Sequence, residues 1–337
     1  MKLWESDHFK NESGEWIAIQ LEKLGVRLEG ELDAFHVRDW SIAIHLPTDQ
    51  GDLYFKAGAD YQKYEASVVA ILGRLAPQKV IVPLAVETAK GWMLLPDGGQ
   101  HMRRYSGGKP ARPDWQTMLS NYAELQIELA NHVEELLEAY LPDRRLELLP
   151  IEYERLLASP NLHELFRVGG LPDEEVAWLH EKQALFAEQV GKLCAIKIPP
   201  SIDHGDLHDG NIFFDGETLR FFDWGDASLT HPFISLIVPL RVLGNYLGFE
   251  PENHPDLEWA RQAYFEPWAN IYGEDAVTKT WELVLPIGYF QRAMTWFQVA
   301  SASDAADHKE HAAAFVAWLR DFLYFPNMPP EGESPVV

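Results

Sequence analysis

His204-Gly205-Asp206-Leu207-His208-Asp209-Gly210-Asn211 is the stretch of this chain whose residue types restrict the fold most strongly. Its two glycines break regular structure, so the stretch is predicted to be a loop. The apolar triplet Ile212-Phe213-Phe214 follows, then the turn Asp215-Gly216, and then Leu219-Arg220-Phe221-Phe222, which leads to Asp223. Apolar runs on both sides of an Asp-Gly turn predict a β-hairpin. The loop therefore enters a hairpin, and Asp223 stands at the exit of that hairpin.

Three polar side chains of this region, Asp206, Asn211 and Asp223, are expected to converge on one small volume, because a hairpin returns the chain to its starting point. Asp206 can accept a hydroxyl proton, while Asn211 and Asp223 offer the oxygen atoms that magnesium prefers. One base and two oxygen ligands are what phosphoryl transfer requires. Each residue alone would be an ordinary turn or cap residue, so the hypothesis depends on their joint spacing.

The spacing resembles the catalytic loop H-R-D-x-x-x-x-N and the following D-F-G of protein kinases. The letters HGDLHDGN and FFDWG are similar to those of one branch in particular, the aminoglycoside phosphotransferase and choline kinase-like family of small-molecule kinases. The resemblance implies that Asp206 is the catalytic base, that Asn211 and Asp223 bind magnesium, and that His204 braces the loop. A protein kinase is less well supported, because no A-P-E signature follows Asp223.

A transition-metal site is the alternative interpretation of the same loop. Two histidines and two carboxylates are a set of ligands that zinc accepts. Against this alternative, the glycines make the stretch a loop, and it contains no helical pair of histidines four residues apart. The four side chains concerned are His204, Asp206, His208 and Asp209.

Composition limits the classes of partner. The chain has 337 residues and a formal net charge of −24, which disfavours nucleic acid and anionic membranes as partners. The acidity indicates solubility or, alternatively, the attraction of a cationic substrate. The single cysteine excludes an internal disulfide, and neither a signal peptide nor an apolar run of about eighteen residues is found. We therefore expect a cytoplasmic protein.

The first part of the chain, residues 16–58, is predicted to form strands, and a helix with apolar residues at helical spacing follows it. Glu65 lies on that helix, close to its apolar face, where a carboxylate needs a cationic partner. Lys56, at the end of the third strand, is the expected partner. The pair resembles the strand lysine and helix glutamate of kinases, in which the lysine positions the nucleotide phosphates. The strand candidates are 32–37, 41–46 and 53–57.

The turn between the first two strands, Arg38-Asp39-Trp40-Ser41, contains no glycine. The phosphate loop of kinases is usually rich in glycine, so this chain departs from the pattern there. The hydroxyl or amide of Ser41 is the candidate phosphate contact, and a plain hairpin turn is the alternative.

Two further strands are predicted at 80–86 and 92–95, and Pro96-Asp97-Gly98-Gly99 ends the second one. By the resemblance, this segment is the hinge whose backbone contacts the purine ring. Because Pro96 has no N–H group, its carbonyl and the amide of Gly98 are the expected contacts. A simple interdomain linker is the alternative.

The rest of the chain is predicted to be mainly helical. The predicted helices span 113–140, 150–158 and 172–193, and more follow within 233–325. Members of the family often carry an aspartate soon after the proline that corresponds to Pro232, but here the neighbourhood holds Ser235. Asp226 is interpreted as a turn residue, with a place near the metal as the alternative. Residues 326–337 contain several prolines and are predicted to be a loose tail.

These observations predict an α+β protein with a two-lobed protein kinase-like fold. Residues 1–97 would form a small N-lobe, an antiparallel sheet with one helix that binds the nucleotide, and residues 98–325 a larger helical C-lobe that holds the catalytic loop and the acceptor site. The expected activity is transfer of the γ-phosphate of ATP or GTP, with Mg²⁺, to a hydroxyl of a small molecule. Candidate acceptors are an aminoglycoside, choline or ethanolamine, a sugar and a hydroxyamino acid. The alternative is an inactive kinase-like protein that binds a nucleotide or metabolite.

Overall fold

The computed structural model describes residues 3–248, 252–303 and 307–326, so all of the predicted tail except Pro326 lies outside the described residues. The chain folds into two compact units. The N-terminal unit consists of Met1–Ala111, Glu134–Leu141 and Asp209–Asp226. The C-terminal unit consists of Arg112–Val133, Pro142–His208 and Ala227–Val337. Each unit is therefore built from segments that are far apart in the sequence.

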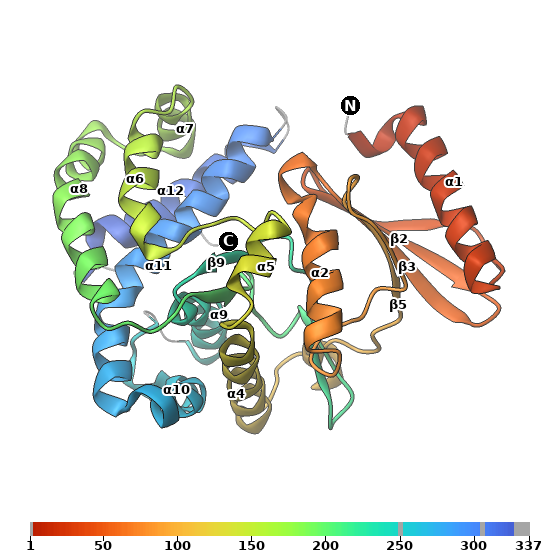
Figure 1. The fold of residues 1–337 in the computed structure, drawn as a ribbon. Coiled ribbons are helices and arrows are strands. Elements are labelled where there is room, and N and C mark those ends of the chain that lie inside the picture. The colour runs from red at the N-terminus through yellow and green to blue at the C-terminus, as the bar shows by residue number, and fades with distance from the viewer. Residues whose placement is uncertain (1–2, 249–251, 304–306, 327–337) are drawn as a thin grey trace. The chain divides into compact units, whose positions relative to one another are not determined.

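The core of the N-terminal unit is a five-stranded antiparallel sheet (Figure 1). The strands predicted near residues 32–37, 41–46, 53–57 and 92–95 are confirmed. Residues 80–84, however, are not part of the sheet, and the predicted strand is reduced to its last residues. In spatial order the strands are β1 (Asp33–Val37), β2 (Ser41–Thr48), β3 (Gly51–Gly58), β5 (Trp92–Pro96) and β4 (Ala85–Glu87).

The prediction of strands over residues 16–58 was wrong for its first part, because a helix, α1 (Asp7–Leu24), occupies the start of the chain. The side chain of Ser6 caps it by accepting a hydrogen bond from the Phe9 amide at 3.2 Å, and Gly25 ends it with φ +69°. Every fourth residue of α1 is buried, which is the spacing of one helix face. The buried residues are Phe9, Ser13, Ile17 and Leu21.

Strand β3 directs successive side chains to opposite faces of the sheet. Phe55 and Ala57 are buried in the apolar cluster that α1 covers. Lys56 lies between them and faces the other side, where α2 (Tyr64–Leu75) packs. The helices α1 and α2 thus cover opposite faces of the sheet (Figure 1).

The hairpin predicted after the central loop is confirmed. Strand β7 (Ile212–Phe214) pairs antiparallel with β8 (Leu219–Phe221). The amide of Phe214 donates to the Gln100 carbonyl at 2.9 Å, and the amide of Phe221 donates to the Lys79 carbonyl at 2.8 Å. These bonds attach the hairpin to the N-terminal unit. The same unit contains the short helices η2 (Asp60–Gln62) and α3 (Met102–Tyr105) and all of α5 (Val133–Glu138) except its first residue.

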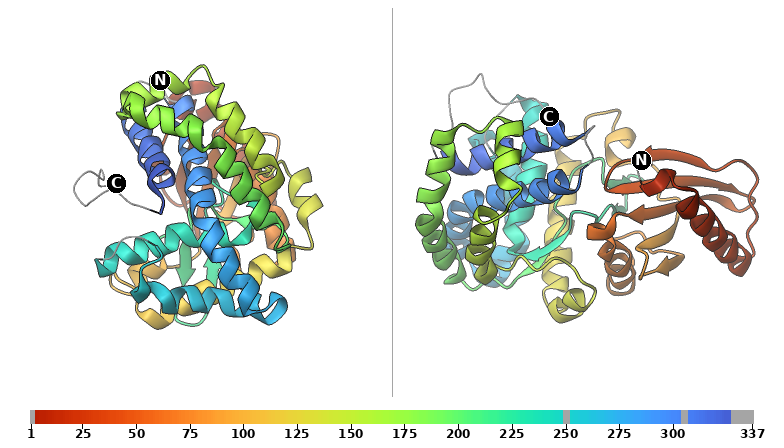
Figure 2. Two further views of the ribbon diagram at one scale, coloured as in Figure 1. Left: turned by 90° about the vertical axis from the view of Figure 1, so that its left-hand side faces the viewer. Right: turned by 90° about the horizontal axis from the view of Figure 1, so that it is seen from above.

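The C-terminal unit is mainly helical, as predicted (Figure 2). Helix α4 packs against α10, α11 against α12, and α8 against α6 and α11. The helix predicted at 113–140 is interrupted between Leu129 and Val133. In the sequence, the apolar spacing continues across this break, so it did not reveal it, and Tyr140, at the end of that stripe, is 85% exposed. The helices are α4 (Arg112–Leu129), α6 (Leu149–Leu157), α7 (Leu162–Gly169), α8 (Asp173–Cys194), α9 (Ile237–Leu247), α10 (Glu258–Tyr272), α11 (Glu274–Ala302) and α12 (His308–Tyr324).

Short elements connect these helices. Strand β6 (Ser201–Asp203) pairs antiparallel with β9 (Ser228–Thr230), and the 3₁₀ helix η4 (Pro232–Leu236) follows β9. Since β6 leads directly into the loop quoted at the outset, it sets the position of that loop within the C-terminal unit. None of the helices in the described ranges is both long and apolar enough to cross a membrane.

Candidate active site

The predicted pair of Lys56 and Glu65 is present in the N-terminal unit. The Lys56 Nζ atom lies 2.6 Å from Glu65 Oε1, and the Glu65 side chain is only 2% exposed. Burial raises the pKa of Glu65, and Lys56 opposes that effect. The amide of Trp224 donates a second hydrogen bond to Glu65 Oε1 at 3.0 Å. The buried carboxylate of Glu65 therefore contacts both Lys56 of β3 and Trp224, the residue that follows Asp223.

Asp223 is the third member of this cluster. Its Oδ1 atom lies 2.5 Å from Lys56 Nζ, and its side chain is 47% exposed. Burial would lower the pKa of Lys56, but the charges of Asp223 and Glu65 outweigh burial and raise it, so the lysine is a firmly held cation. Asp223 has φ +66°, a left-handed backbone conformation that few residues other than glycine adopt. Such strain in a half-exposed acidic residue is typical of a functional site.

The loop before the hairpin is anchored inside the same unit. Asp209 is fully buried, and Arg103 of α3 donates to both of its carboxylate oxygens at 2.7–3.2 Å. Asn211 is buried as well, and its backbone carbonyl accepts a hydrogen bond from the Phe222 amide at 3.2 Å. Asn211 and Asp223 are therefore neighbours across the two ends of the hairpin.

Asp206 belongs to the C-terminal unit. Its Oδ1 atom accepts from Arg292 Nη2 of α11 at 3.1 Å, and its Oδ2 atom lies 3.4 Å from His208 Nε2. Burial would raise the pKa of Asp206, but the hydrogen bond to His208 and the charge of Arg292 outweigh it and hold the pKa well below its usual value. His204 is buried, with its ring edge-to-face against Tyr122. Asp206 is therefore kept ionised and ready to accept a hydrogen bond.

A second acidic residue, Asp203, supports the start of this loop, and the sequence did not indicate it. Its Oδ1 atom accepts from the Gly205 amide at 3.1 Å and from the Ser235 hydroxyl at 2.7 Å. Gln126 of α4 donates in turn to the Ser235 hydroxyl at 3.0 Å. Ser235 of η4 thus lies in a chain of hydrogen bonds that runs from Gln126 of α4 to Asp203 of β6.

The residues predicted to contact the nucleotide all lie in the N-terminal unit. Ser41 is buried and begins β2, opposite Gly58 of β3. Pro96 ends β5. Gly98 lies so close to the Phe213 ring that an added Cβ atom would come within 2.2 Å of it. Glycine is thus required at position 98 by packing, and the contacts of these residues with a nucleotide remain predictions.

The zinc alternative gains no support from the described residues, among which no group of three or more His, Cys, Asp or Glu side chains is placed to hold a metal. Asp209 pairs with Arg103. Asp226, whose carboxylate accepts from the Gln62 side chain at 3.2 Å, lies in a turn, as predicted.

Comparison with solved structures identifies the fold as kinase-like. The ethanolamine kinase of Plasmodium vivax is similar with a TM-score of 0.61 at 13% identity, over 94% of this chain and 89% of that one. The GDP complex of aminoglycoside 2'-phosphotransferase-IIIa matches with a TM-score of 0.60 at 13% identity, over 92% of this chain and 97% of that one. The complex of spectinomycin phosphotransferase with ADP and spectinomycin matches with a TM-score of 0.51 at 12% identity, over 89% of this chain and 93% of that one. At such identities the likeness shows the fold alone.

Sequence comparisons narrow the assignment. No curated protein matches the chain. The family model described as the phosphotransferase enzyme family matches residues 53–271, which is more than half of the chain and includes Lys56, Asp206, Asn211 and Asp223. The chain therefore belongs to the phosphotransferase enzyme family.

Proposed function

We propose that this protein transfers the γ-phosphate of ATP or GTP to a hydroxyl group of a small molecule. The observation that carries the proposal is the cluster of Lys56, Glu65 and Asp223, in which a buried carboxylate holds a lysine against a half-exposed, strained aspartate. Phosphoryl transfer depends on such fixed charges, because the protein contributes mainly positioning and electrostatic stabilisation.

Each candidate residue has a role in this proposal. Lys56 orients the nucleotide phosphates, and Glu65 fixes the lysine. Asp206 accepts the hydrogen bond of the acceptor hydroxyl, aims its oxygen and takes its proton. The lowered pKa of Asp206 keeps the side chain ionised at neutral pH, so its carboxylate can accept the hydrogen bond of the acceptor hydroxyl.

The donor set suits a magnesium ion. Asn211 and Asp223 offer an amide oxygen and a carboxylate, hard oxygen ligands of the kind that Mg²⁺ binds beside phosphates. The half-exposed carboxylate of Asp223 can face a bound ligand. When bound, the ion would offset the charge of the phosphates.

The nucleotide and the acceptor are described by class. The Pro96 carbonyl, the Gly98 amide and Ser41 are the proposed nucleotide contacts. The acceptor is a small compound with a hydroxyl group, and an amino group is the candidate for a second functional group on the same molecule. The similar structures whose descriptions name an aminoglycoside, ethanolamine or spectinomycin support the class of acceptor but do not identify it.

Acceptor-dependent release of ADP from ATP, or of GDP from GTP, tests the proposal. The wild-type protein is incubated with Mg²⁺ and ATP or GTP, with and without a panel of hydroxyl compounds. We expect release that requires both Mg²⁺ and an acceptor. Asp206→Asn should lower the turnover by a factor on the order of 10²–10⁴, the usual contribution of a positioned base, and should leave nucleotide affinity unchanged. Nucleotide binding without turnover of any acceptor would favour the inactive binding protein instead.

A further inference from the structure

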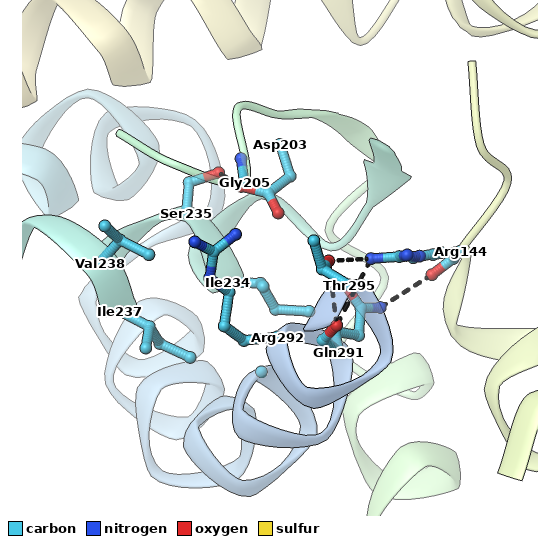
Figure 3. A pocket seen from close by; sticks show the side chains of 11 residues that line it. Arg144, Asp203, Gly205, Ile234, Ser235, Ile237, Val238, Gln291, Arg292 and Thr295 are labelled. Atoms are coloured by element: carbon cyan, nitrogen blue, oxygen red, sulfur yellow. Dashed lines mark hydrogen bonds between the residues drawn. The ribbon is translucent and has the colours of Figure 1, made fainter. Parts of the chain in front are cut away.

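Arg292 of α11 lies on the wall of a small pocket in the C-terminal unit (Figure 3). Figure 3 shows its guanidinium group directed toward Gly205, the residue that precedes Asp206, and toward Ser235 of η4. The space that the centre of a water molecule can reach in this pocket is about 20 Å³, which suits one or two waters. A hydroxyl acceptor does not fit there, so binding of an acceptor inside the pocket does not explain the arginine.

Arg292 instead contacts the proposed catalytic base. Its Nη2 atom donates to Asp206 Oδ1 at 3.1 Å, and Asp206 Oδ2 lies 3.4 Å from His208 Nε2. The arginine side chain is 11% exposed and the aspartate side chain 35%, so the arginine is the more enclosed partner. With a nitrogen atom beside each oxygen, the carboxylate has little freedom to rotate. A carboxylate can accept about four hydrogen bonds, so two fixed nitrogens do not prevent it from accepting another from a hydroxyl.

Two aromatic rings lie beside the guanidinium group of Arg292. Its central carbon is 5.8 Å from the centre of the Trp296 ring, on the same helix, and 6.0 Å from the centre of the Trp318 ring of α12. Both distances fall within the range of cation–π attraction. The rings therefore favour the position in which the arginine reaches Asp206.

The helix that carries Arg292 is attached to the strands that carry the loop of Asp206. Gln291, the preceding residue, is buried, and its side-chain amide donates to the Thr230 hydroxyl of β9 at 2.6 Å and to the Arg144 carbonyl at 3.0 Å. Strand β9 pairs with β6, which leads into the loop. Both partners of the contact between Arg292 and Asp206 are thus held by the same pair of strands. Hydrogen bonds behind a site keep its side chains in one geometry.

The charge of Arg292 makes Asp206 a weaker base, because a nearby cation stabilises the ionised carboxylate. An arginine at this place therefore suits the orientation of the base better than strong proton abstraction. Phosphoryl transfer is compatible with such an arrangement, since its catalysis consists almost entirely of positioning and electrostatic stabilisation. A displacement of about 1 Å can lower the rate on the order of 10²-fold, so a residue that fixes the base contributes to turnover.

We propose that Arg292 is a positioning residue for the transfer. It holds the Asp206 carboxylate in the orientation that aims the acceptor hydroxyl, and it contacts neither the acceptor nor the nucleotide. The inference rests on the proposed function, since Arg292 acts only through Asp206. It adds to that function a residue from α11, 86 positions along the chain from the base.

Arg292→Ala tests this role, with transfer of a labelled γ-phosphate to the acceptor of highest turnover in the panel above. We expect kcat to fall by a factor on the order of 10 to 100, while the KM values for acceptor and nucleotide change by less than about threefold. Arg292→Lys should restore part of kcat, because it keeps a cation and a donor. Arg292→Gln replaces the alanine variant if that one does not fold. The control is Arg155→Ala on α6, where the arginine is 71% exposed and pairs with Glu152 at 2.6 Å, and it should leave all three constants unchanged.

The same substitution in the Asp206→Asn background shows whether Arg292 acts through Asp206. Residues that act as a unit are not additive, so Arg292→Ala should lower kcat there by less than about threefold. An equal loss in both backgrounds, a higher acceptor KM with kcat intact, or an unchanged kcat would each overturn the inference and leave the proposed function standing. A wild-type protein that phosphorylates no acceptor of the panel would instead refute the proposed function, and the inference with it.

Discussion

Asp223 and Lys56 show how few residues determine the proposed chemistry. The aspartate combines φ +66° with a lysine contact at 2.5 Å, and the lysine also contacts the buried Glu65. Removing one partner of a buried ion pair is costly because the remaining charge has lost its compensation. Stability and catalysis can therefore be separated at this cluster.

Lys56→Met should lower the free energy of unfolding by about 3 kcal/mol and the turnover on the order of 10²-fold or more. Adding Glu65→Gln removes the uncompensated charge, and the amide can still accept from Trp224. The double variant should thus recover most of the stability and none of the activity. Urea unfolding and ADP release measure the two quantities. Recovery of activity in the double variant would contradict the role of Lys56.

His231 gives the molecule a predictable response to acid. It is buried, and burial lowers its pKa to about 3. Between about pH 6.5 and pH 3 the unfolded chain binds a proton that the folded protein does not, so the free energy of unfolding falls by about 1.4 kcal/mol for each pH unit lost.

His231→Asn should flatten this dependence on pH. The Asn side chain can still accept from the Phe233 amide, as His231 Nδ1 does at 3.2 Å. Urea unfolding at several pH values should give a slope smaller by about one proton than that of the wild type. His8→Asn, at a side chain 87% exposed, should leave the slope unchanged. Equal slopes for wild type and His231→Asn would disprove the assignment.

At the scale of the elements, Gln126 of α4 makes hydrogen bonds to three other elements, β6, η4 and α10. It is fully buried, and its amide nitrogen donates to the Ile202 carbonyl of β6 at 2.6 Å and to the Ser235 hydroxyl of η4 at 3.0 Å. The Tyr264 hydroxyl of α10 donates to its Oε1 atom. One buried side chain therefore joins the strand that precedes the loop with Asp206 to η4 and α10.

Gln126→Leu should lower the free energy of unfolding by about 3 kcal/mol, because it leaves several buried polar groups without partners. Gln183→Leu, at a partly exposed position on α8, should change it by less than about 0.5 kcal/mol. Thermal unfolding of both variants provides the comparison. Equal effects of the two substitutions would show that the hydrogen bonds of Gln126 contribute little.

The elements also show what the sequence could reveal. The hairpin after Asn211 was predictable because an Asp-Gly turn between apolar runs is a local signal. Helix α1 was missed because its buried face includes Ser13 and its apolar residues are sparse. The contact between Arg292 and Asp206 joins residues 86 positions apart, and no local pattern announces it. The pair of Lys56 and Glu65 was predictable because a buried carboxylate requires a cation.

At the scale of the whole molecule, the chain passes from one compact unit to the other inside the loop that contains Asp206, between His208 and Asp209. Lys56, Asn211 and Asp223 belong to the N-terminal unit, and Asp206 and the pocket with Arg292 belong to the C-terminal unit. The proposed roles divide between the two units in the same way: the N-terminal unit would bind the nucleotide, and the C-terminal unit would bind the acceptor. The predicted lobe boundary at residues 97 and 98 stays a prediction.

Transfer of a labelled γ-phosphate is the most direct test of this account. The wild-type protein and Asp206→Asn are each incubated with Mg²⁺, labelled ATP and the preferred acceptor, and the labelled product is identified. We predict that the wild type places the label on the acceptor hydroxyl, and that Asp206→Asn does so more slowly by a factor on the order of 10²–10⁴ with unchanged ATP affinity. Equally fast labelling by Asp206→Asn, or release of the label as free phosphate alone, would contradict the central claim.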